Sequence, residues 1–324
     1  MNNFAYVNAT SLKEATAALG SSWSDAVVLA GGTDLLGLMK DYVMSPARLV
    51  NIKNIKELGG ISKSGSGLRI GATVTFDELA GNAMVRQLFP SITQAVHGVS
   101  SPQVRNMGTV GGDLCQRPRC WYFRLGHGVL AMQDGKSLVT DGENKYHAIF
   151  SNGQAHFVSA SSLGPVLVAL GAKVKLVSAS GSREVDAAKF FVAPQTNEAR
   201  EIALLPNEIL TEIVIPAVGR NATYEVRQKD ALDWPLATAT VSLTMKGNTV
   251  STANIVLGHV GPTPYHAVAA GKALIGKTIT AESAMAAGTA AVQDAKPLSQ
   301  NAYKIQLARV AVKRALLEAA GIKA

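Results

Sequence analysis

Residues 101–114 read SPQVRNMGTVGGDL, and more of the fold depends on this stretch than on any other segment. Three glycines, Gly108, Gly111 and Gly112, fall within five residues of it. Glycine reaches positive φ without a steric penalty and lets another molecule approach the main chain closely. Successive N–H groups exposed by such a turn form a concave anion site. The stretch therefore predicts a phosphate-binding loop, with an ordinary tight turn as the alternative.

A shorter version of the same pattern occurs earlier, at residues 29–35, which read LAGGTDL. In both stretches a threonine lies beside a glycine, and an Asp-Leu step follows the glycine pair directly or after one residue. One such loop alone favours an ordinary turn. Two in one chain favour a dinucleotide, whose two linked phosphates give both loops a ligand.

The two loops together also carry a family resemblance. Residues 30–34 (AGGTD) and 103–112 (QVRNMGTVGG) resemble the FAD-binding motifs of the molybdenum hydroxylases, the family of xanthine dehydrogenase, aldehyde oxidoreductase and carbon monoxide dehydrogenase. The resemblance extends over the whole chain, and the paired motifs are specific in combination. It implies FAD as the cofactor and the flavin-carrying (medium) subunit as the role.

The same resemblance implies a division of labour among subunits. A molybdopterin-binding large subunit oxidises the substrate, and a small subunit carries the electrons through [2Fe–2S] clusters. The flavin of this chain then passes them to NAD⁺, O₂ or another acceptor. The alternatives are a self-sufficient FAD-dependent oxidase or reductase with the same cofactor fold, and a non-catalytic nucleotide-binding protein. We find no catalytic residue set of this chain's own.

The expected fold class is α+β. The resemblance implies a PCMH-type FAD-binding domain at 1–217, made of two subdomains (about 1–58 and 59–217), and a small C-terminal domain of the CO dehydrogenase flavoprotein type at 218–324. Local patterns agree: residues 26–29 predict a strand entering the first loop, residues 35–39 a helix leaving it, and residues 49–52 a second strand. Proline, glycine and polar residues at 216–221 indicate the domain boundary.

Further along, helical spacing predicts a helix at 163–170, and alternation predicts strands at 173–177 and 208–216. In the C-terminal part, residues 237–244 and 251–257 predict an antiparallel pair, and residues 301–320 predict a long helix that is apolar on two sides. The polar, turn-rich segment 142–157 is expected to run over the surface.

Composition restricts the function further. Of the 324 residues, 47% are hydrophobic and 17% charged, which is typical of a packed globular protein. The net charge is +8, yet no Lys/Arg run occurs, so nucleic acid is not expected as a partner. The densest basic group, Arg117, Arg119 and Arg124, alternates with aromatic residues and suits an acidic partner subunit or an anionic cofactor equally well.

No direct membrane insertion is expected, because the longest apolar run, 166–172, is too short to span a bilayer. Residues 1–6 do not resemble a signal peptide, so the default location is cytoplasmic, with co-export on a signal-bearing partner left open. Two cysteines, Cys115 and Cys120, form no disulfide framework. Their segment resembles the branch of the family with an extra iron–sulfur cluster, but a [4Fe–4S] cluster needs four cysteines, so neither a cluster nor another metal is expected.

The expected cofactor-binding residues lie in the two loops and in one later segment. They are Leu29, Ala30, Gly31, Gly32, Thr33, Asp34, Gln103, Asn106, Gly108, Thr109, Gly111, Gly112, Asp113 and Lys229. Asp34 has helix capping as an equal alternative. Asp113 replaces the asparagine that is common in the family, and a carboxylate beside a phosphate must point away from it. The resemblance places a basic side chain near the flavin ring, with Lys229 as the candidate and Arg227 next.

Overall fold

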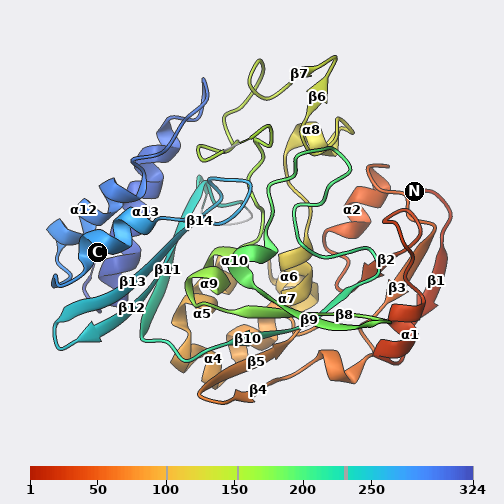
Figure 1. The fold of residues 1–324 in the computed structure, drawn as a ribbon, viewed down its shortest axis with the longest axis horizontal. Coiled ribbons are helices and arrows are strands. Elements are labelled where there is room, and N and C mark those ends of the chain that lie inside the picture. Colours follow the sequence, from red (N-terminus) through yellow and green to blue (C-terminus); the bar gives the residue numbers. More distant parts are fainter. Residues whose placement is uncertain (100, 152, 230–232, 324) are drawn as a thin grey trace.

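The computed structural model describes residues 1–99, 101–151, 153–229 and 233–323. It arranges the chain in three successive sheet-containing parts, with the N-terminal part and the C-terminal part at opposite sides of the molecule (Figure 1). The mixed helix and strand content confirms the predicted α+β class.

The N-terminal part is a small parallel sheet with strand order β1-β3-β2. Its strands are β1 (Ala5–Asn8), β2 (Val27–Leu29) and β3 (Arg48–Asn51), and its helices are α1 (Leu12–Ala17) and α2 (Leu35–Lys40). The first glycine loop joins β2 to α2, so the strand-loop-helix-strand order predicted from the sequence is confirmed. A short 3-10 helix, η1 (Lys56–Leu58), leads into the next part.

The central part is a five-stranded antiparallel sheet with strand order β4-β5-β10-β8-β9. Its strands are β4 (Ile61–Ser64), β5 (Gly67–Gly71), β8 (Lys173–Ser178), β9 (Gly181–Asp186) and β10 (Ile209–Ile215). Its helices are α3 (Phe76–Gly81), α4 (Ala83–Leu88), α5 (Pro90–Gly98), α6 (Pro102–Met107), α7 (Val110–Cys115), α9 (Leu163–Ala169) and α10 (Ala187–Phe190). These helices and the sheet enclose the largest apolar cluster of the described residues.

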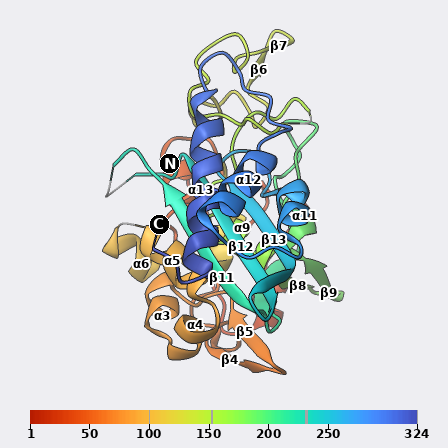
Figure 2. The ribbon, with the colours of Figure 1, turned by 90° about the vertical axis from the view of Figure 1, so that its left-hand side faces the viewer.

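The C-terminal part is an antiparallel sheet with strand order β11-β12-β13-β14. The strands are β11 (Arg220–Val226), β12 (Ala237–Lys246), β13 (Thr249–Gly258) and β14 (Tyr265–His266), and the helices are α11 (Val268–Leu274), α12 (Ala281–Ala291) and α13 (Tyr303–Ala319). Figure 2 shows α13 lying across the strands, while α5 and α9 of the central part also pack against this sheet. A helix that is apolar on two sides suits such packing.

The segment between α7 and α9 contains α8 (Trp121–Arg124) and the hairpin β6 (Met132–Gln133) and β7 (Lys136–Ser137), which projects at the top of Figure 1. The prediction that 142–157 is a surface excursion is wrong for its middle. The N–H groups of Ile149 and Phe150 both donate to the carbonyl of Val260, and the ring of Phe150 stacks on Tyr265 with centroids 3.8 Å apart. The segment is irregular but packs into the C-terminal core.

No helix in the described part of the chain is both long and apolar enough to cross a bilayer. The boundary predicted at 217/218 stays a prediction; it falls in the connection between β10 and β11.

Candidate functional site

The first glycine loop leaves a row of backbone donors unpaired. Gly32 lies at φ +75°, a conformation that glycine reaches without a steric penalty. Among the described residues, the N–H groups of Gly31, Gly32, Thr33 and Asp34 donate to no backbone or side-chain acceptor. Unpaired N–H groups are costly unless water or a ligand accepts from them. Four in succession form the kind of concavity that binds an anion.

The second loop is built differently from the expectation. Thr109 begins α7, and its hydroxyl accepts from the N–H of Gly112 at 3.1 Å. The N–H of Gly111 donates to the carbonyl of Ala72 at 2.9 Å, and that of Gly108 donates to Val104. These three glycine amides are therefore used inside the protein, and that of Gly111 joins α7 to the residue that follows β5. The hydrogen of the Thr109 hydroxyl stays free to donate.

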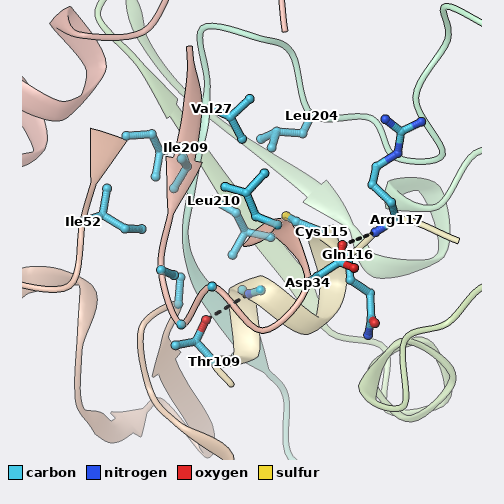
Figure 3. Close-up of a pocket in the computed structure, with 18 of the residues that line it drawn as sticks. Val27, Asp34, Ile52, Thr109, Cys115, Gln116, Arg117, Leu204, Ile209 and Leu210 are labelled. Carbon is cyan, nitrogen blue, oxygen red and sulfur yellow. Dashed lines mark hydrogen bonds between the residues drawn. The ribbon is translucent and has the colours of Figure 1, made fainter. Parts of the chain in front are cut away.

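Two cavities meet at these loops and share Thr33, Asp34, Thr109, Gly112 and Gln116 in their walls. The first, drawn in Figure 3, is mainly apolar. Its walls include apolar side chains of the N-terminal part and of the segment around the start of β10: Trp23, Val27, Leu38, Ile52, Leu204, Ile209 and Leu210. The second cavity is more polar, and its walls include Val99, Ser101, Asp113, Arg119, Ser162 and Trp234.

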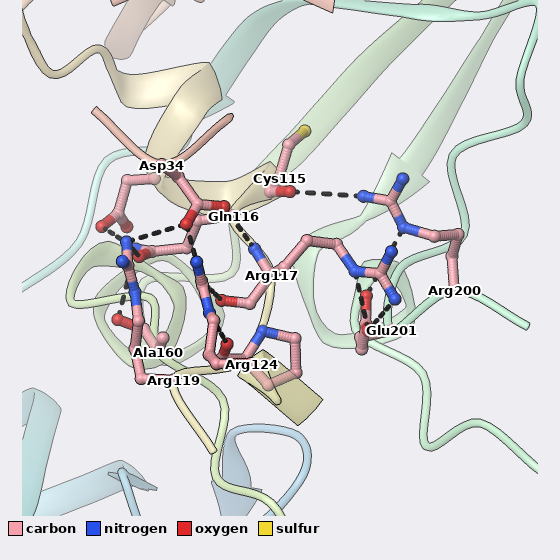
Figure 4. Close-up of polar contacts among 11 residues, drawn as sticks. Asp34, Cys115, Gln116, Arg117, Arg119, Arg124, Ala160, Arg200 and Glu201 are labelled. Carbon is pink, nitrogen blue, oxygen red and sulfur yellow. Dashed lines mark hydrogen bonds and ion pairs between the residues drawn. The ribbon is translucent and has the colours of Figure 1, made fainter. Parts of the chain in front are cut away.

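Asp34 is held by three arginines (Figure 4). Its carboxylate accepts from the backbone N–H of Arg117 at 2.8 Å and pairs with the guanidinium groups of Arg124 at 2.7 Å and Arg119 at 3.1 Å. It makes no capping bond to α2, so the capping alternative is wrong. The basic group predicted for a partner or cofactor thus has a structural role, since it fixes the first loop against the segment after the second.

Two arginines, Arg117 and Arg200, also line the first cavity. Arg117 donates to Glu201 through both Nε and an Nη, at 2.9 and 2.7 Å. Arg200 lies 4.2 Å over the ring of Trp23, which lines the cavity. A desolvated cation over an indole face is attracted to it.

Asp113 lies in the wall of the second cavity, but its carboxylate is bound to the start of α9. It accepts from the hydroxyl of Ser161 and from the N–H groups of Ser162 (3.3 Å) and Leu163 (3.0 Å), which lie at the start of α9. Burial raises the pKa of this carboxyl group, and these hydrogen bonds oppose the rise. Asp113 therefore connects α7 to α9 and fixes the floor of the second cavity.

Not all expected site residues come together. Ten of them line one cavity or both: Ala30, Gly31, Gly32, Thr33, Asp34, Gly108, Thr109, Gly111, Gly112 and Asp113. Leu29 lies behind the first loop, and Gln103 and Asn106 are exposed on α6. Lys229 is exposed and lines a separate groove between β11 and α13, together with Arg227.

The two cysteines lie close to the site in sequence but are free thiols. Burial raises the pKa of Cys115 to about 12, with Arg200 opposing the rise. Cys120 Sγ lies 3.2 Å from Nε2 of His147. Within the described ranges, no group of three or more His, Cys, Asp or Glu side chains has the arrangement of a metal site.

Several wall residues were not predicted from the sequence. Gln116, Ser162 and Trp234 reach the second cavity from three different segments, and Leu204 and Leu210 reach the first from beyond β9. None belongs to a short motif, so only the pairing of distant strands and helices brings them together.

A fold with paired glycine loops between two cavities defines a dinucleotide-binding flavoprotein. The family model described as the FAD binding domain in molybdopterin dehydrogenase matches residues 2–218, and the CO dehydrogenase flavoprotein C-terminal domain matches residues 222–319. The chain belongs to this family of molybdenum hydroxylase flavoproteins. Its cofactor is FAD, and it is an oxidoreductase subunit of the medium, flavin-carrying type.

Individual relatives agree over most of the chain. The chain is 33% identical to the carbon monoxide dehydrogenase medium chain of Hydrogenophaga pseudoflava, over 97% of this chain and 96% of that one. It is 30% identical to the glyceraldehyde dehydrogenase medium chain of Sulfolobus acidocaldarius, over 85% and 82%. A solved structure of carbon monoxide dehydrogenase from Hydrogenophaga pseudoflava, lacking the Mo-pyranopterin moiety, superposes with a TM-score of 0.77, 31% identity and coverage of 99% and 98%.

Proposed function

We propose that this chain is the electron-transfer subunit of a molybdopterin-dependent hydroxylase or dehydrogenase. It takes electrons from [2Fe–2S] clusters of a small partner subunit, which receives them from a molybdopterin-binding large subunit, and FAD passes them to NAD⁺, O₂ or another acceptor. Bound FAD supplies the two-electron redox chemistry, while the residues of this chain bind and orient it.

One observation carries the placement of the cofactor: the unpaired N–H groups of residues 31–34 lie where the two cavities meet. FAD has a diphosphate in its middle and a flat ring system at each end. The amides suit the diphosphate, and the Thr109 hydroxyl adds a donor from the second loop. Donors held in place by the fold cost little to order on binding.

The chemistry of the two cavities supports an assignment of the two ends of FAD. The first cavity, with Trp23, Leu204 and Leu210 in its walls, suits the adenine ring. The second offers Gln116, Arg119 and the hydroxyl of Ser162, which suit the polar edge of the flavin ring. Lys229 lies outside both cavities and has no part in this assignment.

The carboxylates near the cavities support electron relay over direct substrate oxidation. Asp34 is bound by arginines and by a backbone N–H, and Asp113 by the Ser161 hydroxyl and by backbone N–H groups. Glu208 pairs with Arg183, and Asp233 accepts from the N–H groups of Lys229 and Trp234. A general base must be within reach of a substrate proton, and each of these acceptors is already engaged within the chain.

Thr33→Glu tests the cofactor placement. Thr33 is exposed, so the change leaves the core intact, but it puts a negative charge beside the diphosphate. We expect FAD affinity to fall at least tenfold, measured by flavin fluorescence. Leu36→Glu, also exposed and outside both cavities, is the matched control and keeps its FAD. Equal FAD affinity in the two variants contradicts the placement.

Rapid-mixing absorbance tests the relay. The isolated holoprotein is expected to stay oxidised when mixed with an aldehyde or an N-heterocycle, and its flavin is expected to become reduced once the two partner subunits are added. Direct reduction of the flavin by such a substrate, without partners, contradicts the relay and favours a self-sufficient oxidase.

A further inference from the structure

A third cavity adjoins the second and has no part in the FAD assignment. Its volume is about 270 Å³, just below the range of about 300–1,000 Å³ usual for small-molecule sites. It shares Arg119, Asp233, Trp234 and Pro235 with the second cavity, so an occupant lies next to the ring end of that cavity. We call it the side chamber.

The side chamber gathers buried polar atoms that have no partner. Both ring nitrogens of His259 are unpaired within the described residues, although the side chain is only 2% exposed. Nδ1 of His147, which is equally buried, and Nε of Arg119 are unpaired as well. Buried polar atoms are nearly always hydrogen-bonded, so several exceptions around one cavity indicate a missing partner.

His259 is also held in an uncommon backbone conformation. It lies at φ +60°, in the connection between β13 and β14. Nζ of Lys304 fixes this position by donating to the carbonyl oxygen of His259 at 2.7 Å and to those of Tyr146 and His147 at 3.2 Å each. A non-glycine residue kept at positive φ by surrounding contacts is a common feature of functional sites.

Both imidazoles are neutral at physiological pH. Burial lowers the pKa of His259 to about 3, with the positive charge of Lys304 adding to the effect, and burial lowers that of His147 to about 4. A neutral imidazole carries one N–H donor and one acceptor nitrogen. The pair can therefore donate to carbonyl oxygens and accept from hydroxyl groups without a change of charge.

Aromatic rings form the other walls of the side chamber. Trp121, Tyr146, Phe157 and Trp234 line it, and the guanidinium of Arg119 lies 4.7 Å over the ring of Trp234, between the two cavities. Trp121 meets His147 edge to face, with centroids 5.1 Å apart. Such walls suit a flat ring system, and the unpaired donors suit polar groups on its edge.

We propose that the side chamber binds the electron acceptor of the flavin, and that this acceptor is a quinone. The inference rests on the proposed electron-transfer function and names its acceptor class. A quinone is flat, and its carbonyl oxygens accept from the imidazole N–H groups and from Nε of Arg119. NAD⁺ fits less well, because none of the described residues that line the chamber belongs to a glycine loop that could hold a second diphosphate.

The overall step balances without another reactant. A quinone in the chamber would take up two electrons and two protons from the reduced cofactor and become a quinol, and the cofactor would return to its oxidised form. The two carbonyl oxygens become hydroxyl groups. A neutral imidazole then reverses its role, since its free nitrogen accepts from the hydroxyl.

Binding of menadione, a soluble naphthoquinone, tests the proposal on the purified holoprotein. Quenching of tryptophan fluorescence reports occupancy of the chamber through Trp121 and Trp234, independently of turnover. His259→Gly removes the imidazole at a backbone position that glycine adopts easily, and Val158→Phe narrows the chamber without removing a polar group. We expect both to weaken menadione binding at least tenfold while FAD content and melting temperature change little.

Two further variants separate chemistry from folding. His259→Asn keeps a side-chain N–H and tolerates positive φ, so we expect menadione binding within about threefold of the parent protein. His97→Leu changes an exposed histidine outside the chamber and should leave binding unaltered. Reoxidation of the chemically reduced flavin by menadione should follow the same order, whereas ferricyanide, which needs no ring site, should react equally with all variants.

The outcomes are distinct. Saturable menadione binding that both chamber variants weaken supports the proposal. Binding that is non-saturable, or unchanged in both variants, overturns it. Saturable reoxidation by NAD⁺ that Val158→Phe abolishes overturns the quinone assignment in favour of a nicotinamide. If the protein holds no FAD but still binds menadione in the chamber, the proposed function fails while the binding site stands.

Discussion

A Cβ atom built on Gly31 would lie 1.8 Å from the carbonyl oxygen of Met107. The two glycine loops are therefore in direct backbone contact, although 76 residues separate these two positions in the sequence. The glycine pair of the first loop does two things: Gly31 lets the second loop approach, and Gly32 supplies the positive φ. The first loop therefore takes its place only when the N-terminal and central parts of the fold are docked.

Gly31→Ala should disrupt this contact. A methyl group cannot share the position of a carbonyl oxygen, so the loops must separate, and overpacking of this kind costs about 1–3 kcal/mol. We expect FAD content to fall by more than half and the melting temperature to drop. Gly37→Ala is the control, because nothing lies within 4 Å of its Cβ and it sits within α2, where alanine stabilises by up to about 1 kcal/mol. Similar FAD loss in both variants contradicts the role of loop contact.

Asp34→Ala should weaken both folding and cofactor binding. The change leaves the guanidinium groups of Arg119 and Arg124 facing each other in a partly buried site without their carboxylate. Removing one partner of such a cluster commonly costs several kcal/mol, because the remaining charges stay desolvated. The double variant with Arg124→Ala should recover part of the loss, giving a coupling energy above about 1 kcal/mol in urea unfolding. Strictly additive effects contradict the ion-pair cluster.

Much of this site was predictable because its main signals are local. The strand before the first glycine turn and the helix after it lie in consecutive residues, so the sequence correctly predicted a loop between a strand and a helix there. The second loop was also located, but the N–H of Gly111 donates to the carbonyl of Ala72, a contact that the local sequence does not reveal.

The remainder depends on contacts that no local pattern encodes. Arg119 meets Trp234 across more than a hundred residues, and Asp113 finds its partners at the start of α9. The polar composition of 142–157 predicted a surface segment, but Ile149 and Phe150 are buried in the C-terminal core. The family resemblance suggested a basic side chain near the flavin, with Lys229 as the candidate, but Lys229 lines the separate groove between β11 and α13.

Both cysteines should resist alkylation in the native protein. Burial raises the pKa of Cys115 to about 12 and also raises that of Cys120, and the thiolate is the reactive form. We expect less than a tenth of either thiol to be labelled by iodoacetamide at pH 8 in the time that labels both fully in urea. Mass spectrometry of tryptic peptides measures each site. Rapid native labelling of Cys115 contradicts its burial beside the first cavity.

The neutral histidines of the side chamber should make stability fall in acid. The pKa of His259 is lowered to about 3 and that of His147 to about 4, both below the ordinary value of 6.5. The unfolded chain therefore takes up protons below pH 6.5 that the folded protein refuses, and each histidine then costs about 1.4 kcal/mol per pH unit. Burial lowers the pKa of Lys304 to about 7, so the stability that this lysine costs on acidification is already lost above pH 6.5. The raised pKa values of Asp113 and Glu225 have the opposite effect, because they favour the folded state as the pH falls.

Comparison with one variant isolates the histidine contribution from these other groups. His259→Asn removes one titrating ring and keeps the backbone conformation accessible. Between pH 7 and pH 5, the free energy of unfolding of the parent protein should fall by about 2 kcal/mol more than that of the variant. Urea unfolding at a series of pH values measures both slopes. Parallel slopes for the parent protein and His259→Asn would mean that His259 is not buried as a neutral ring.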